Sequence, residues 1–200
     1  MDDKKIQTKQ SYDKNAAMFA GKFDELGARK ADIDKALSFI DKQNPFVFEL
    51  GCGNGRDAKE ILSRTNKYLG IDISRELIRL AKEKAPEGSF EEGDFDTYQF
   101  PKVVDVIFAF ASLLHANKES LQGILNRACE SLNTGGVFFI SLKYGEYVEK
   151  RQEDEFGVRY FYYYTPELVK ELAGNKFKCV WEQVHDLRGQ KWMEVILQKV

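Results

Sequence analysis

Three glycines at alternate positions follow a short apolar segment, and this spacing is typical of a ligand-binding loop. The stretch FVFELGCGNGRDA, residues 46–58, runs from β-favouring residues into Gly51, Gly53 and Gly55. Glycine has no Cβ atom and adopts positive φ easily, so the backbone of such a loop can lie directly against a ligand. The residues that follow predict a helix, whose first amides would face a carboxylate or phosphate group. A plain turn, a pyrophosphate site and a site for an adenosyl sulfonium all fit the glycines alone.

The residue after the loop separates two of these ligands. A dinucleotide fingerprint has the pattern GxGxxG, and its last glycine allows helix and strand to pack closely beside the pyrophosphate. Arg56 occupies that last position here. A side chain of this size disfavours a nicotinamide-dependent reductase, which stays as an alternative function. The shorter GxGxG pattern favours a loop that lies against an amino-acid moiety.

Acidic residues lie at the ends of three predicted strands. Glu49 is in the first strand, Asp72 follows the second, and Asp94 ends a weaker third strand pattern. A carboxylate has two oxygens and can accept hydrogen bonds from two neighbouring hydroxyl groups. The carboxyl ends of parallel strands meet at one edge of an open sheet, where ligands bind. We therefore expect one crevice to collect these three acids together with Phe110.

The elements that must position these residues alternate along the chain. Strand-like and helix-like patterns take turns from residue 46 to residue 142, which predicts a doubly wound α/β sheet with helices on both faces. Near the end of the chain, two strand patterns lie too close together for a crossover helix and predict an antiparallel hairpin. We expect a mostly parallel seven-stranded sheet of Rossmann-like type that ends in this hairpin. The predicted strands cover residues 46–50, 67–71, 89–94, 103–110, 137–142, 177–184 and 192–199, with 185–191 as the hairpin connection; the predicted helices cover 56–64, 74–85 and 117–132.

Two other segments are expected to cover the ligand edge of the sheet. Helical spacing in residues 11–23 and 28–40 predicts two N-terminal helices, which form part of a lid within residues 1–44. Residues 144–164 form an excursion that ends where Thr165 caps a further helix. In this excursion the run EKRQEDE predicts a solvated, mobile loop, and RYFYYY predicts an extended segment whose alternate residues face opposite sides.

Composition limits the class of protein and its partners. The chain has 200 residues, of which 43% are hydrophobic and 13% aromatic, and this suffices for one domain over residues 1–200. Thirty Lys and Arg against 32 Asp and Glu leave a net charge of −2, so no overall basic field would attract nucleic acid. No apolar run predicts a signal peptide or a membrane segment, which indicates a cytoplasmic protein. The three cysteines are far apart and predict neither a disulfide nor a metal site.

Together these motifs resemble the class I S-adenosylmethionine-dependent methyltransferases, and the resemblance covers most of residues 12–200. Residues 49–55 fit the family's acidic-x-GxGxG motif, residues 105–115 its fourth motif and residues 135–143 its fifth strand. The resemblance implies the Rossmann-like methyltransferase fold and S-adenosyl-L-methionine as cofactor. It also implies that Asp72 binds the ribose hydroxyls and that Asp94 and Phe95 bind adenine. The full set of implied cofactor-binding residues is Tyr12, Glu49, Gly51, Gly53, Gly55, Asp72, Ile73, Asp94, Phe95 and Phe110.

The acceptor of the methyl group is expected to be a small polar metabolite. Methylases of adenine and cytosine amino groups carry a Pro-Pro motif after the fourth strand, whereas this chain has AFASLLH there. His115, just beyond that strand, is the candidate catalytic group because its pKa range suits removal of a proton. Tyr144, Arg159 and Tyr163 are the candidate substrate-binding residues, with Arg159 suited to a carboxylate or phosphate. A non-catalytic S-adenosylmethionine-binding module remains an alternative, and the oligomeric state, the acceptor and its attacked atom stay open.

Overall fold

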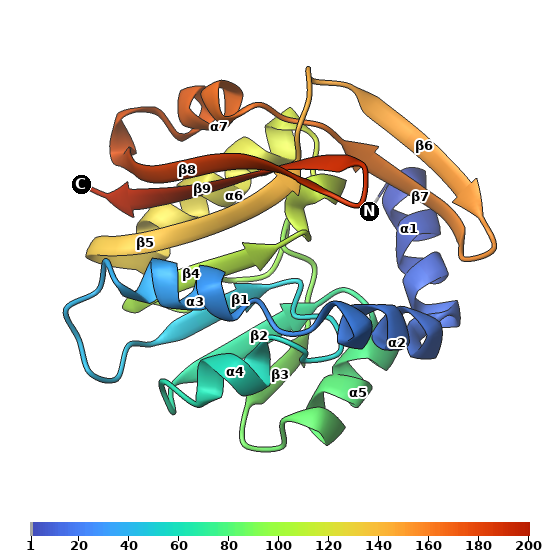
Figure 1. Ribbon diagram of the computed structural model, residues 1–200, viewed down its shortest axis with the longest axis horizontal. Helices are drawn as coiled ribbons and strands as arrows, with labels where there is room; N and C mark the ends of the chain where they lie inside the picture. Colours follow the sequence, from blue (N-terminus) through green and yellow to red (C-terminus); the bar gives the residue numbers. More distant parts are fainter. Residues whose placement is uncertain (1) are drawn as a thin grey trace.

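The computed structural model describes residues 2–200 and contains the predicted seven-stranded sheet (Figure 1). The strand order is β3-β2-β1-β4-β5-β9-β8, in which β1 to β5 run parallel and β9 runs antiparallel to both of its neighbours. This arrangement confirms the predicted Rossmann-like fold with its C-terminal antiparallel pair. The strands are β1 Val47–Leu50, β2 Tyr68–Asp72, β3 Ser89–Glu92, β4 Val104–Phe110, β5 Leu132–Lys143, β8 Phe177–Leu187 and β9 Gln190–Lys199, and a separate hairpin consists of β6 Glu149–Asp154 and β7 Gly157–Tyr162.

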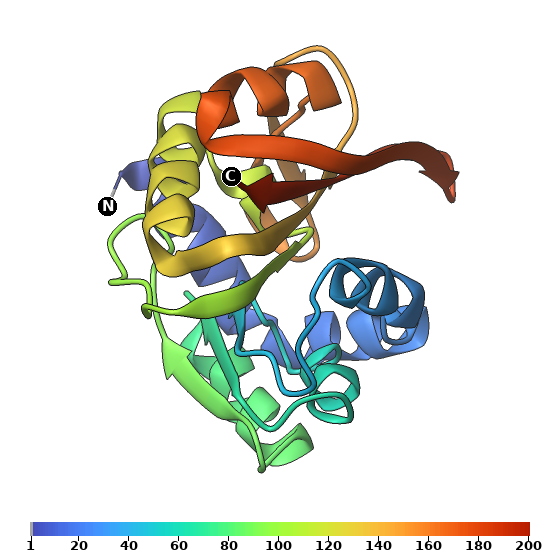
Figure 2. The same ribbon diagram turned by 90° about the vertical axis from the view of Figure 1, so that its left-hand side faces the viewer.

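Helices cover both faces of the sheet. One apolar cluster joins the sheet to α6 and α7, and a second joins its other face to α3, α4 and α5. Figure 2 shows these layers, with α6 in yellow on one side of the strands and α3 in blue on the other. No helix in residues 2–200 is long and apolar enough to cross a membrane. The helices are α1 Asp3–Lys14, α2 Ala16–Leu26, α3 Lys30–Leu37, α4 Ala58–Leu62, α5 Arg75–Lys84, α6 Lys118–Ser131 and α7 Pro166–Ala173, with short 3₁₀ turns η1 Leu113–His115 and η2 Gly174–Lys176.

Strand β4 illustrates why the central strands read as continuous apolar runs. All seven of its residues are buried. Val106 and Phe108 face the cluster of α3, α4 and α5, while Ile107 and Ala109 face the cluster of α6 and α7. A parallel strand buried on both faces carries apolar residues at successive positions rather than at alternate ones. Asp105 is the exception in β4, and its buried carboxylate accepts hydrogen bonds from Lys42 Nζ at 2.5 Å and from the Phe46 amide at 2.8 Å. The strand ends at Phe110, and the turn that follows carries His115 to the ligand edge.

The N-terminal segment differs from the prediction, because three helices replace the expected two. Helix α1 begins at Asp3, where the Asp2 side chain accepts a hydrogen bond from the Lys5 amide at 2.8 Å. The predicted single helix across residues 11–23 is wrong, since the chain breaks at Asn15. The Asn15 side-chain amide donates to Ser11 O and to Phe156 O, and such local bonds compete with helix continuation. The break places Tyr12 in the last turn of α1.

The charged run in the excursion is a strand rather than the predicted loop. Strand β6 pairs antiparallel with β7, so that Gln152 lies opposite Arg159. All six residues of β6 are exposed, which agrees with their charge, but backbone pairing with the aromatic strand fixes them in an extended form. Helix α1 packs against this hairpin, where the Ser11 hydroxyl donates to Val158 O at 2.8 Å. Figure 1 shows β6 and β7 beside α1 and apart from the main sheet.

The C-terminal hairpin is tighter than predicted. Most of residues 185–191 continue the two strands, which pair as far as Leu187 and Gln190. Only Arg188 and Gly189 connect them, with φ of 53° and 79°. Two residues with positive φ match the right-handed twist of antiparallel strands, which explains the short connection.

Candidate functional site

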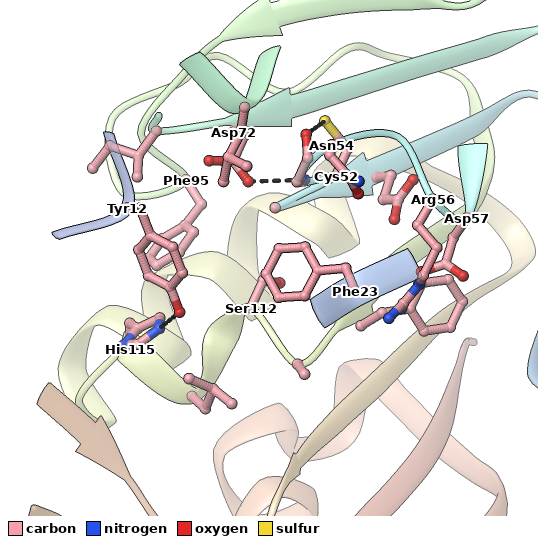
Figure 3. A pocket seen from close by; sticks show the side chains of 18 of the residues that line it. Tyr12, Phe23, Cys52, Asn54, Arg56, Asp57, Asp72, Phe95, Ser112 and His115 are labelled. Atoms are coloured by element: carbon pink, nitrogen blue, oxygen red, sulfur yellow. Dashed lines mark hydrogen bonds and ion pairs between the residues drawn. The ribbon is translucent and has the colours of Figure 1, made fainter. Parts of the chain in front are cut away.

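A cavity of about 380 Å³ opens at the carboxyl ends of β1, β2 and β4 (Figure 3). The glycine loop lies at one end of it, and residues from β5, β6, β7 and η1 lie at the other. This is the edge at which ligands bind in open α/β sheets. Its lining includes these predicted site residues: Tyr12, Glu49, Gly51, Gly53, Asp72, Ile73, Phe95, Phe110, His115 and Arg159.

The glycine loop is tied to the end of β2 by three consecutive amides. The amides of Gly51 and Cys52 both donate to Ile71 O, at 2.8 and 2.9 Å, and the Gly53 amide donates to Asp72 Oδ2 at 2.9 Å. Gly51 and Gly53 have φ of 74° and 55°, the region in which side chains are strained. A Cβ atom at Gly53 would meet only the ring of Phe23, at 3.5 Å. The loop backbone at Gly53 is therefore open toward the cavity.

Asp72 holds the glycine loop and the start of α5 together. Its second carboxylate oxygen, Oδ1, accepts from the Ser74 amide at 2.9 Å. Burial raises the pKa of Asp72 to about 6, although the Ser74 and Gly53 amides favour the charged form. Each oxygen of a carboxylate has a further lone pair that can accept a hydrogen bond from a ligand.

Glu49 is the most enclosed acid of the cavity, with 1% of its surface exposed. The Tyr68 hydroxyl donates to Glu49 Oε2 at 2.5 Å. Burial, followed by the charge of Asp57, raises the pKa of Glu49 to about 8. The carboxyl group therefore carries its proton at neutral pH unless a positive charge lies beside it.

Tyr12 and His115 meet across the cavity although 103 positions separate them in the chain. His115 Nδ1 lies 2.6 Å from Tyr160 O, and a carbonyl can only accept, so Nδ1 carries the ring proton. Nε2 then accepts from the Tyr12 hydroxyl at 3.0 Å, the contact visible in Figure 3. Burial lowers the pKa of His115 to about 4 and raises that of Tyr12 to about 12. At neutral pH the pair consists of a neutral imidazole and a protonated phenol.

Arg159 and Phe161 of β7 both point toward the cavity, which settles the orientation of the aromatic strand. Arg159 Nη2 donates to Asp154 Oδ2 at 2.6 Å, and its guanidinium carbon lies 5.0 Å from the ring centre of Phe19. Lys143, Gln152 and Trp192 complete this end of the cavity. Within residues 2–200, no group of three or more His, Cys, Asp or Glu is arranged to hold a metal ion.

Comparison with known proteins finds relatives of the part of the chain that holds the glycine loop. Residues 47–136 match the family model described as a methyltransferase domain. This segment holds the glycine loop and strands β1 to β4, and through it the chain is similar to the class I S-adenosylmethionine-dependent methyltransferases. An uncharacterized methyltransferase of Bacillus cytotoxicus is 33% identical over 98 residues, which are 48% of this chain and 46% of that protein. The chain thus spans about half the length of the curated relatives that it matches.

Solved structures of methyltransferases share the fold. An S-adenosylmethionine-dependent methyltransferase from Clostridium acetobutylicum superimposes with a TM-score of 0.75 at 12% identity, over 92% of this chain and 98% of that one. A second is the 1,6-didemethyltoxoflavin-N1-methyltransferase of Burkholderia thailandensis, solved with bound 1,6-didemethyltoxoflavin and S-adenosylhomocysteine. Its TM-score is 0.70 at 16% identity, over 92% of this chain and 87% of that one. The cofactor of the family, S-adenosylmethionine, agrees with the residues at the loop end of the cavity.

Four predicted site residues do not line the cavity. Gly55 has φ of 75° and faces α5, where a Cβ atom would lie 3.1 Å from Ala81 Cα. Asp94 Oδ1 accepts from Lys5 Nζ at 2.6 Å, so a lysine of α1 holds the carboxylate that the resemblance assigns to adenine. The other two are in the excursion: Tyr144 pairs with Tyr164 in an isolated bridge, and the Tyr163 hydroxyl donates to Gln190 Oε1 at 3.2 Å.

Several cavity residues were not predicted from the sequence. Asn54 and Asp57 belong to the glycine loop itself, and their position in the motif was an available signal. Ser112 and Lys143 follow β4 and end β5, so the strand ends could have indicated them. Phe23 had no such signal, because α2 reaches the cavity only through tertiary packing.

Proposed function

We propose that this chain transfers a methyl group from S-adenosylmethionine to a small polar metabolite by in-line displacement. One observation carries the proposal: a single cavity joins the glycine loop to His115 and Arg159. The acceptor would lie at the end formed by these two residues, opposite the loop. Positioning of two reactants in one cavity is a large part of catalysis when the leaving group is already good.

The loop end of the cavity suits the cofactor. Asp72 offers free lone pairs to two ribose hydroxyls, and Glu49 offers a carboxyl group that would ionise beside the ammonium of the methionine moiety. The open backbone at Gly53 suits the approach of that moiety, and Ile73 and Phe95 supply apolar surface for the adenine. When bound, S-adenosylmethionine supplies an electrophilic methyl group on a sulfonium centre.

His115 is the proposed proton acceptor. Its Nε2 is unprotonated and lies inside the cavity, while Tyr160 O fixes the ring through Nδ1. Removal of a proton from an acceptor hydroxyl or amine would use Nε2 after the Tyr12 hydroxyl turns away from it. Because burial and the charges of Arg159 and Lys143 hold the pKa of His115 at about 4, a bound acceptor would have to raise that pKa for the transfer to occur. Helix α1 and the β6–β7 hairpin would act as a lid that excludes water, within a single domain of residues 1–200.

Structural neighbours support a small acceptor. The Burkholderia enzyme is named for 1,6-didemethyltoxoflavin, and a Synechocystis neighbour is named magnesium protoporphyrin IX methyltransferase. The free, separate cysteines are consistent with a reducing compartment, so we place the reaction in the cytoplasm. A reductase is the weaker alternative because Arg56 occupies its third glycine position.

A methyl-transfer screen tests the proposal. Purified protein is incubated with a metabolite pool and S-adenosylmethionine carrying a labelled methyl group, and the label is traced by mass spectrometry. We expect label on one small polar compound. Label on bulk RNA, DNA or protein and on no small molecule would contradict the proposed acceptor. Binding of NADH in preference to S-adenosylmethionine would instead favour the reductase.

Binding of S-adenosylhomocysteine is expected to release protons at about pH 7. The free protein holds a proton on Glu49, whose pKa is about 8, and a bound ammonium would lower that pKa. The complex then binds fewer protons than the free protein, so affinity should rise with pH up to about 8. Calorimetry at one pH in buffers of different ionisation enthalpy measures the release. Glu49→Gln should abolish most of it, and identical heats for the wild type in all buffers would contradict the assignment.

A further inference from the structure

We propose that the methyl acceptor carries an anionic group, a carboxylate or a phosphate, which binds between Lys143 and Arg159. The inference rests on the proposed function, because it concerns the acceptor end of the same cavity. It narrows the proposed class of acceptor from small polar metabolites in general to small anionic ones. Two cations of the cavity carry the argument: Lys143 has no carboxylate partner among the described residues, and Arg159, although paired with Asp154, has a buried Nε atom without a hydrogen bond.

Lys143 ends β5 and places an unpaired ammonium group at the cavity. Within residues 2–200, no carboxylate lies within ion-pair distance of its Nζ atom, which is 3.9 Å from the centre of the Phe161 ring. Burial lowers the pKa of Lys143, and the positive charges of Arg159 and Lys150 lower it further. A half-buried cation without a carboxylate partner is unfavourable, so a bound anion would stabilise it.

The guanidinium group of Arg159 also keeps N–H groups that are not paired with a carboxylate. Only 9% of its side chain is exposed, and its Nη2 atom is paired with Asp154. Its Nε atom is buried and, among the described residues, has no hydrogen-bond partner. The rings of Phe19, Phe156 and Phe161 lie within 6 Å of the guanidinium carbon and hold it in place. A guanidinium fixed in this way can bind an oxyanion through its remaining N–H groups.

The two ends of the cavity therefore differ in charge. Three acids and one cation line the loop end, namely Glu49, Asp72 and Asp57 with its ion-pair partner Arg56, whereas Lys143 and Arg159 line the acceptor end. Asp154 is the one carboxylate paired with these two cations in residues 2–200, and it does not line the cavity. A cationic acceptor would be repelled from this end, while an anionic one would supply the missing partner. Aromatic side chains of Phe161 and Trp192 favour an acceptor that also has an apolar part.

Matched probes test the inference on the full-length protein saturated with S-adenosylhomocysteine. Benzoate, phenyl phosphate and neutral benzamide are titrated by calorimetry. We expect one of the two anions to bind at least about tenfold more tightly than benzamide, and the preferred anion distinguishes a carboxylate site from a phosphate site. Lys143→Gln should weaken that anion about tenfold and leave benzamide binding unchanged.

Two further variants separate binding from folding. Lys67→Gln removes the same charge from an exposed position at the amino end of β2, away from the cavity. This control should leave the affinity for both anions and for benzamide unchanged. Arg159→Lys keeps the charge beside Asp154 but removes the planar fork, so it should weaken the anion without unfolding the protein. Equal binding of anions and benzamide, no binding of either anion, or an unchanged anion affinity in Lys143→Gln would overturn the inference. The affinity for S-adenosylhomocysteine is measured separately and tests the proposed function. If S-adenosylhomocysteine does not bind, titration of the anions into the free protein still tests the anion site.

Discussion

Replacing Gly51 with alanine is expected to lower the free energy of unfolding by about 2–4 kcal/mol and to abolish S-adenosylhomocysteine binding. Gly51 has φ of 74°, and a Cβ atom there would lie 2.2 Å from Ser112 Cβ. The substitution combines backbone strain with overlap against the segment that follows β4. Either the loop or that segment must move, and both line the cavity. Thermal or denaturant unfolding and calorimetry measure the two effects.

Gly189→Ala is the matched control for this substitution. Gly189 has φ of 79°, but nothing lies within 4 Å of the position of its Cβ atom. The control should therefore show only the backbone cost, about 1 kcal/mol, with cofactor affinity unchanged. The double variant Gly51→Ala with Ser112→Gly lacks the Ser112 Cβ atom that the new methyl group would meet. It should therefore recover part of the lost stability. If Gly51→Ala is no less stable than Gly189→Ala, close packing against Ser112 is not the reason for this glycine.

Replacing Asp72 with alanine is expected to weaken S-adenosylhomocysteine binding by about 2–3 kcal/mol, or about 30- to 150-fold. The substitution removes the proposed acceptors for the ribose hydroxyls. It also releases the Gly53 and Ser74 amides, which both donate to this carboxylate. The loop would then lose the bond that orders it before the ligand arrives. Calorimetry with a folded variant measures the affinity.

Asp72→Asn separates the two roles of this carboxylate. Its amide oxygen can still accept from one backbone amide but carries no charge, so we expect a smaller loss of affinity than for alanine. Asp34→Ala, at an exposed acid paired with Arg64, serves as the charge control and should leave affinity unchanged. Wild-type affinity in a folded Asp72→Ala protein would remove Asp72 from the proposed cofactor site.

Most of the fold could be predicted because it depends on local patterns. The alternation of strand-like and helix-like periods identified the strands from β1 to β5, and two adjacent strand patterns identified the C-terminal hairpin. The positions of Glu49 and Asp72 in the cavity followed from topology, since parallel strands bring their carboxyl ends to one edge, whereas Asp94 was also expected there and pairs with Lys5 instead. These features require no knowledge of which side chains meet.

Helix α1 and strand β6 could not be predicted in the same way. Of the twelve residues of α1, only Thr8 and Ser11 are buried, so the helix has no apolar stripe to detect. Its position depends on distant contacts such as the ion pair of Lys5 with Asp94. Strand β6 is exposed at every residue and exists through its pairing with β7. Burial and pairing partners, rather than local propensity, decide such elements.

The residues of the cavity also divide into those that the sequence indicated and those that only tertiary contacts brought there. Residue types and their spacing were sufficient to indicate the glycine loop, Asp72 and His115. The face of β7 that points inward was not indicated, because a shift of one residue reverses every side chain of a strand. Packing against α1 decided that Arg159 faces the cavity, and the end of β5 brought Lys143 beside it. Local periodicity therefore determined the strands, residue types and spacing indicated the glycine loop, and the resemblance that these motifs carry implied the cofactor. Contacts between distant segments decided which charges line the end of the cavity opposite the loop.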